Sequence, residues 1–282
     1  MKIYVSSSSI KNEKIHETLI ELFQNGFHNI ELSGGSKHYN ELKNDIISLK
    51  KQYHLNLLIH NYFPPPEQHF VLNLASLDDE IYTKTIEHYL LALDLSKTIG
   101  ADCFSIHAGF LIDISPDEIG TNISLSQNNK KENAIERFSK GYNIIKQKAE
   151  NINLYIENNV LNKKNFQTFN INPFLLTTAK DYFELKQSIE FNLLLDIAHL
   201  KVSCTTLGVD FEEELGKLAS VSNYWHISDN NGLIDSNNPF FEDSEIVKLI
   251  RNFSADIITL EVYDDINEIK RCHQILSNIY SL

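Results

Sequence analysis

Carboxylate and imidazole side chains stand at the ends of several short apolar runs in this sequence. A carboxylate that follows a buried run must be protonated, paired or bound to a metal, because an isolated charge is costly to desolvate. The runs bring no Arg or Lys to these ends. Carboxylate and imidazole together form a ligand set for Mn²⁺, Zn²⁺, Co²⁺ or Fe²⁺. The residues concerned are Glu31, His60, His107, Glu157, Asp196, His199, His226 and Glu261.

The spacing of these residues places them on neighbouring elements. His107, Glu157, Asp196, His226 and Glu261 follow one another at intervals of 30 to 50 residues. Each interval is about one strand and one helix long, so each side chain is expected on the next strand at a similar level. Glu31 is instead expected only to pair with a neighbouring side chain inside the floor of the barrel that these strands would form.

The elements that would position these residues are apolar runs alternating with helical patterns. The runs are nearly continuous, as in parallel strands buried on both faces. They cover 2–6, 29–33, 56–60, 103–107, 153–157, 192–197, 223–228 and 256–262. Helical patterns cover 12–24, 39–52, 78–99, 131–149, 177–188, 210–220, 242–252 and 265–279.

This alternation predicts an α/β fold, a (β/α)₈ TIM barrel that forms a single domain over residues 1–282. An open doubly wound sheet is the alternative, but no Gly-rich phosphate turn follows the first run. The longest non-periodic stretches are 109–130, 158–174 and 229–241. All three follow strands, so they are expected at the C-terminal face of the barrel, where 109–130 is long enough to form a lid.

Composition narrows the classes of function. Lys and Arg number 25 against 38 Asp and Glu, a formal charge of −13, which argues against nucleic acid as a partner. Three widely spaced cysteines without a CxxC pair indicate a reducing compartment. The N-terminus lacks the features of a signal peptide, and no apolar run approaches the ~18 residues of a membrane span. We therefore expect a cytoplasmic protein; its oligomeric state is not indicated.

The ordered motifs resemble the xylose isomerase-like barrel superfamily, which includes sugar isomerases, sugar epimerases and endonuclease IV. The resemblance covers nearly the whole chain, and the order and spacing of the motifs are more specific than any single one. The motifs are His60-Asn61-Tyr62 with Asn73–Ser76, Ser105–Gly109, Tyr155–Asn158, Asp196–His199, Trp225–Asp229 and Thr259–Glu261.

The resemblance implies a metal site and roles for its surroundings. Its four ligands would be Glu157, Asp196, His226 and Glu261, with Mn²⁺, Zn²⁺ or Co²⁺ as the divalent ion. His199 would lie beside the substrate. By the same resemblance, His60 and His107 would match two ligands of an additional zinc ion in the endonuclease branch.

Two departures from the family pattern narrow the reaction. The stretch 232–241 holds no His, where the endonuclease branch has one that helps to bind a third zinc ion. Residues 229–232 hold no Arg, where ketose 3-epimerases have one after the seventh-strand His. These departures argue against a three-zinc nuclease and against an epimerase of free ketohexoses.

The chemistry expected is isomerisation or epimerisation of a sugar, sugar phosphate or polyol derivative. A proton would leave the carbon beside a carbonyl, and a divalent metal would stabilise the enediolate intermediate. Glu157 and Glu261 would act as base and acid, and His199 would hydrogen-bond a substrate oxygen. His60 and His107 would orient substrate or bind a second metal.

Two further residues have a structural and a functional interpretation. Asn158 is either a turn residue or a substrate contact, and Asp229 either caps a turn or contacts substrate. A metal-dependent nuclease or phosphoesterase, a dehydratase and a noncatalytic binding barrel remain as alternatives. The partner expected is a small carbohydrate-like substrate.

Overall fold

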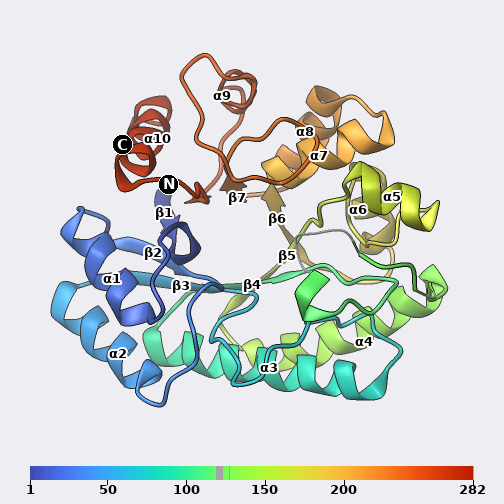
Figure 1. The fold of residues 1–282 in the computed structure, drawn as a ribbon, viewed down its shortest axis with the longest axis horizontal. Helices are drawn as coiled ribbons and strands as arrows, with labels where there is room; N and C mark the ends of the chain where they lie inside the picture. Colours follow the sequence, from blue (N-terminus) through green and yellow to red (C-terminus); the bar gives the residue numbers. More distant parts are fainter. Residues whose placement is uncertain (119–122, 127, 282) are drawn as a thin grey trace.

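The computed structural model describes residues 1–118, 123–126 and 128–281, and within them eight parallel strands close into a barrel in chain order (Figure 1). A closed barrel excludes the open doubly wound sheet. The observed strands agree with the predicted runs, apart from a few residues at the ends of β2 and β6–β8. They are β1 (Lys2–Ser6), β2 (Asn29–Leu32), β3 (Asn56–His60), β4 (Cys103–His107), β5 (Asn153–Glu157), β6 (Asn192–Asp196), β7 (Tyr224–Ile227) and β8 (Ile257–Leu260).

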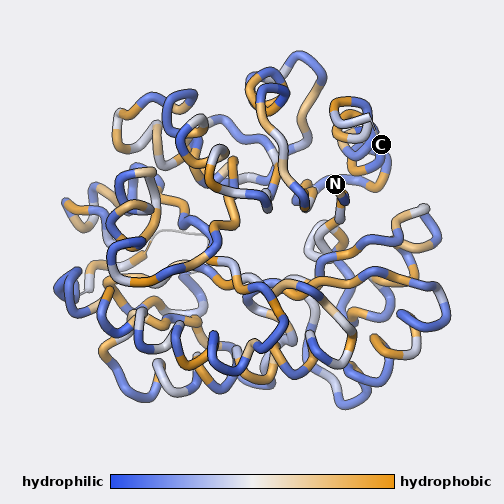
Figure 2. The backbone as a smooth tube through the Cα atoms, turned by 180° about the vertical axis from the view of Figure 1, so that it is seen from behind, coloured by the Kyte–Doolittle hydropathy of each residue, from blue (hydrophilic) through white to orange (hydrophobic). Residues whose placement is uncertain are grey.

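Helices surround the barrel, and in Figure 2 hydrophobic and hydrophilic segments alternate along them, as expected of helices with one buried face. The helices that follow the predicted patterns begin or end within a few residues of them. They are α1 (Ile15–Gln24), α2 (Leu42–Tyr53), α3 (Asp79–Ile99), α4 (Lys131–Ala149), α6 (Ala179–Lys186), α8 (Phe211–Ala219), α9 (Glu245–Ile250) and α10 (Ile266–Ile279). None of the described helices is long and apolar enough to cross a membrane.

Two further helices lie where the sequence analysis expects none. α5 (Lys163–Phe169) lies in the predicted loop 158–174. α7 (Ile197–Leu207) begins directly after β6, and the Asp196 carboxylate caps it by accepting a hydrogen bond from the His199 amide at 2.7 Å. Ile197 and Ala198 read as a continuation of an apolar strand, which hides the start of this helix.

Backbone hydrogen bonds join the loop after β4 to the loop after β5, and others close the loop after β7 on itself. Phe110 and Phe174 form an antiparallel bridge between the first two, and Asp229 pairs with Asn238 within the third. The predicted loop 109–130 contains a short 3₁₀ turn, η2 (Pro116–Glu118), and its residues 119–122 and 127 lie outside the described part of the chain.

The hydrophobic core joins the strands to the inner faces of the helices. Ile156 and Leu195 on strands belong to the same buried cluster as Leu93 and Phe138 on helices. A separate small cluster consists of Ile112, Ile123, Leu161, Phe169 and Phe174, all of which lie between β4 and α4 or between β5 and α6. The main core packs the helices against the barrel, and the second cluster packs the segments after β4 and β5 against each other.

Candidate active site

Glu157, at the end of β5, lies at the centre of the polar residues predicted from the strand ends. Its Oε2 lies 3.0 Å from His60 Nε2 and 3.1 Å from His107 Nε2, and these two nitrogens are 3.2 Å apart. Its Oε1 lies 3.6 Å from His226 Nδ1 and 3.5 Å from His199 Nδ1. With a side chain 1% exposed, Glu157 therefore belongs to two groups of possible ligands at once.

The first group, the imidazole cluster, consists of His60, His107 and Glu157. Its three ligand atoms lie within 4.8 Å of one another. Ser105, opposite His60 in the β3–β4 register, holds the other side of the ring, with Oγ 2.8 Å from His60 Nδ1. Three mutually close ligand atoms from three neighbouring strands are an arrangement that fits a divalent metal ion.

The second group, the carboxylate cluster, consists of Glu157, Asp196 and His226, with Glu261 beside them. The first three place ligand atoms within 4.8 Å of one another, and Glu261 Oε2 lies 3.6 Å from His226 Nδ1. Glu157 Oε2 and His226 Nδ1 are buried, and their contacts of 3.0 to 3.6 Å with the surrounding side chains lack hydrogen-bond geometry. Buried polar atoms of this kind call for an ion or a water, so these residues fit a divalent metal ion.

The pKa shifts in the carboxylate cluster also favour a bound cation. Burial, together with nearby Glu157 and Asp235, raises the pKa of Asp196 to about 7, although His199 opposes the shift. Burial would also raise the pKa of Glu157, but His107, His60 and His226 hold it well below its usual value. Asp196 is therefore the buried carboxylate whose charge its neighbours compensate least, and a cation beside it would relieve the repulsion from Glu157 and Asp235.

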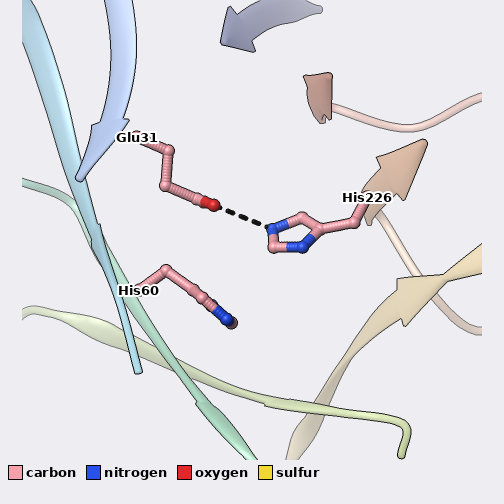
Figure 3. Close-up of side chains that lie close together, drawn as sticks. All are labelled: Glu31, His60 and His226. Atoms are coloured by element: carbon pink, nitrogen blue, oxygen red, sulfur yellow. Dashed lines mark ion pairs between the residues drawn. The ribbon is translucent and has the colours of Figure 1, made fainter. Parts of the chain in front are cut away.

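His226 is anchored on its other side by Glu31, at the end of β2. His226 Nε2 lies 2.9 Å from Glu31 Oε1, and both side chains are fully buried (Figure 3). The expectation that Glu31 pairs with a neighbour inside the barrel is confirmed.

His199, the third residue of α7, lies between the carboxylate cluster and a loop carboxylate. Its Nδ1 lies 2.8 Å from the backbone oxygen of Asn158, and its Nε2 lies 3.3 Å from Asp235 Oδ2 and 3.8 Å from Asp196 Oδ2. Asp235 was missed in the sequence because it lies in an irregular loop, without any pattern that marks it. Burial would lower the pKa of His199, but Asp196 and Asp235 raise it well above its usual value.

The Asn158 side chain links β5 to β6. Its side-chain amide donates to the backbone oxygen of Asp196 at 2.9 Å, and its side-chain oxygen accepts from the Asp196 amide at 2.8 Å. With both ends occupied, Asn158 fixes Asp196 relative to Glu157. It is absent from the described lining of the cavity, so the geometry favours its structural interpretation.

Asp229 also lies apart from the ligand groups. Its carboxylate lies 2.8 Å from Lys201 Nζ and accepts from the Asn230 amide at 2.8 Å. Its backbone amide and oxygen both bond to Asn238. Asp229 thus fixes the base of the loop that carries Asp235, and it too is absent from the described cavity lining.

A cavity of about 1010 Å³ opens above the two clusters. Its lining includes His60, His107, Glu157, His199, Asp235 and Glu261. One part, after β1 and β2, is mainly polar and contains Ser8, Lys11, Asn12, Ser33 and Lys37. Another part, after β4 and β5, combines apolar and polar side chains and contains Phe110, Ile114, Ile123, Val160 and Phe174 beside Glu118, Asn159, Asn162 and Asn165. A cavity of this size and mixed lining is typical of small-molecule sites.

Comparisons with solved structures reveal the same fold in several proteins. A D-tagatose 3-epimerase-like protein shares 17% identity, with a TM-score of 0.73 over 100% of this chain and 97% of its own. A 3-keto-D-glucoside 4-epimerase from E. coli shares 12%, with a TM-score of 0.65 over 100% of both chains. Endonuclease IV from Thermus thermophilus shares 12%, with a TM-score of 0.60 over 100% of both. At these identities the likeness shows the fold.

Sequence comparison places the chain in a family. No curated protein sequence gives a significant match. The model of the xylose isomerase-like TIM barrel family, however, matches residues 20–273, which is most of the chain and includes all the residues of both clusters. The chain therefore belongs to the xylose isomerase-like TIM barrel family.

Proposed function

We propose that the protein is a divalent-metal-dependent enzyme that isomerises or epimerises a small carbohydrate-like molecule. The observation that carries this proposal is the position of Glu157 and Glu261. Both line the floor of the cavity, and both approach the same ring nitrogen of His226, at 3.6 Å each. Two carboxylates that lie next to the same metal ligand and also line a small-molecule cavity are suited to proton transfer beside a substrate carbonyl.

The metal ion would be held by Glu157, Asp196, His226 and Glu261. When bound, a divalent cation polarises a carbonyl oxygen and makes the neighbouring carbon more acidic. Burial would raise the pKa of Glu261, but His226 lowers it to about 2, so its carboxylate is ionised at neutral pH, as a metal ligand must be. One of these two carboxylates, Glu157 or Glu261, would remove a proton from one side of the substrate, and the other would return a proton from the other side.

The remaining cavity residues would orient the substrate. His199 lines the cavity and is held on both sides, by Asn158 and Asp235, so its ring has a fixed direction. His107 is the more exposed member of the imidazole cluster, with 32% of its side chain accessible, and would hydrogen-bond a substrate hydroxyl.

The nature of the substrate is supported by the cavity and by the similar structures. An L-ribulose 3-epimerase and D-psicose 3-epimerases share the fold, and their names identify sugar substrates. Two lysines, Lys11 and Lys37, line the cavity, and Lys37 is paired with Glu13. A neutral or weakly charged sugar therefore fits better than a nucleic acid.

A second candidate function is favoured by one specific observation. The imidazole cluster places His60, His107 and Glu157 within ligand distance of one another, next to the carboxylate cluster. Two metal ions sharing Glu157 would suit hydrolysis of a phosphate ester, since paired metals stabilise both the attacking and the leaving oxygen. The protein would then be a phosphoesterase on the same scaffold.

The test uses tag-free protein reconstituted separately with Mn²⁺, Co²⁺ and Zn²⁺. Ketoses, aldoses and their phosphates are incubated in D₂O, and exchange of carbon-bound protons is followed by NMR. Exchange that is lost in Glu157→Gln and Glu261→Gln, but kept in the exposed control Glu212→Gln, supports the proposal. Hydrolysis of bis(p-nitrophenyl) phosphate without any sugar exchange would establish the phosphoesterase in its place.

A further inference from the structure

Glu31 is a buried carboxylate that the proposed proton transfer does not use. Its side chain is fully buried, and it is absent from the described lining of the cavity, so it is not placed to touch substrate. Figure 3 shows Glu31 on β2 and His226 on β7 pointing toward each other inside the barrel. Keeping a charge at such a position is costly unless its partner is well placed.

Each carboxylate oxygen of Glu31 contacts a different side chain. Oε1 lies 2.9 Å from His226 Nε2 as an ion pair that lacks hydrogen-bond geometry, and Oε2 accepts a hydrogen bond from Thr259 Oγ1 at 3.2 Å. Thr259 lies opposite His226 in the β7–β8 register. The Thr259 hydroxyl that donates to Glu31 therefore lies next to the His226 ring that Glu31 contacts.

His60 is close by but is already engaged. It shares a group of possible ligands with Glu31 and His226. However, its Nδ1 faces Ser105 and its Nε2 faces Glu157 and His107. Both nitrogens of His60 are directed elsewhere, so among these rings His226 is the one that Glu31 serves.

A neutral imidazole carries one proton and offers one lone pair. A carboxylate beside Nε2 keeps the proton there, which leaves the lone pair on Nδ1, the nitrogen that faces Glu157 and Glu261. We propose that Glu31 is a positioning residue that fixes the tautomer and ring direction of His226, so that Nδ1 binds the metal. This inference rests on the proposed metal-dependent function. Outer carboxylates of this kind orient ligating imidazoles and typically change metal affinity about 10- to 100-fold.

The experiment compares Glu31→Gln and Glu31→Leu with wild type by titration calorimetry with Co²⁺ and with Zn²⁺. The visible spectrum of the Co²⁺ protein reports the coordination geometry. Gln keeps an acceptor oxygen for Nε2–H, whereas Leu keeps only the bulk. We expect affinity to fall roughly tenfold in Glu31→Gln and roughly 100-fold in Glu31→Leu, with an altered spectrum and an unchanged number of ions.

A matched control is Glu214→Gln, which changes another buried carboxylate, on α8, that accepts from the Ala179 amide at 2.7 Å. Its metal affinity and spectrum should equal those of wild type. If Glu31→Leu does not fold, Thr259→Val removes the donor to Glu31 and should weaken Co²⁺ binding in the same direction.

The outcomes separate this inference from the proposed function. Wild-type affinity and spectrum in Glu31→Gln, Glu31→Leu and Thr259→Val would overturn the inference alone. Loss of one ion per chain in Glu31→Gln, at unchanged affinity for the rest, would make Glu31 a ligand and also overturn it. A wild-type protein that binds neither Co²⁺ nor Zn²⁺ would instead contradict the proposed function.

Discussion

The two ligand clusters share Glu157 but differ in composition and in support. The imidazole cluster combines one carboxylate with His60 and His107, and His107 is partly open to the cavity. The carboxylate cluster adds Asp196 and His226, which are 2% and 0% exposed. A buried, carboxylate-rich group is suited to hold a permanent divalent ion, whereas the more open imidazole pair is suited to contact a ligand that comes and goes.

The supporting contacts differ in the same sense. In the carboxylate cluster, Asn158 fixes the Asp196 backbone from two sides, and Glu31 fixes His226. In the imidazole cluster, Ser105 contacts the His60 ring. Asn61 bonds only to the backbone amide of His107, at 3.2 Å, and does not hold the His107 ring. The difference implies that substitutions in the carboxylate cluster will lower activity more than substitutions in the imidazole cluster, and four measurements test this.

The largest effect is expected for Glu157→Gln, because this residue belongs to both clusters. Turnover of the substrate identified in the screen should fall about 10³-fold or more, within the range that a general base contributes. The measurement is the steady-state rate beside the exposed control Glu212→Gln. Retention of wild-type turnover would remove Glu157 from the chemistry.

Asp196→Asn should affect the carboxylate cluster alone. The amide removes one negative charge from the ligands, so both metal affinity and turnover should fall at least ~100-fold, the upper end for loss of an outer partner. Titration calorimetry and rates at saturating Mn²⁺ check this. Full activity at low metal concentration would show that Asp196 is not a ligand.

Metal removal should lower stability in wild type more than in Glu157→Gln. An ion present at 100 times its dissociation constant stabilises the folded state by about 2.7 kcal/mol. For a chain of this size, chelation should therefore lower the melting temperature by roughly 5–10 °C. Thermal denaturation with and without EDTA measures it, and an equal shift in both proteins would place the metal outside these clusters.

The smallest effect is expected for His107→Gln. If His107 only hydrogen-bonds substrate, its loss should cost roughly tenfold in kcat/KM, mostly through KM, with metal content unchanged. A loss as large as that of Asp196→Asn, together with a lost metal ion, would reverse the contrast. That result would favour the two-metal phosphoesterase.

The barrel and most of the site could be predicted from the sequence because both depend on one simple pattern. Apolar runs mark buried parallel strands, and the carboxyl ends of such strands meet on one face, which brought His60, Glu157 and His226 together without knowledge of any contact.

The rest depends on tertiary contacts that leave no local pattern. Asp235 reaches His199 from an irregular loop, and the sequence around it shows no periodicity. The amide of Asn158 is occupied by the backbone of a neighbouring strand, a partner that is 38 residues away in sequence. The start of α7 is hidden because its first residues are apolar and follow a strand directly.

The metal centre is tested most directly by the metal content of tag-free protein, measured by elemental mass spectrometry for wild type and Glu157→Gln after the same reconstitution with Mn²⁺, Co²⁺ or Zn²⁺. We expect at least one divalent ion per chain in wild type and almost none in Glu157→Gln. Wild-type protein without metal, or Glu157→Gln with the wild-type content, would contradict a metal centre built on Glu157.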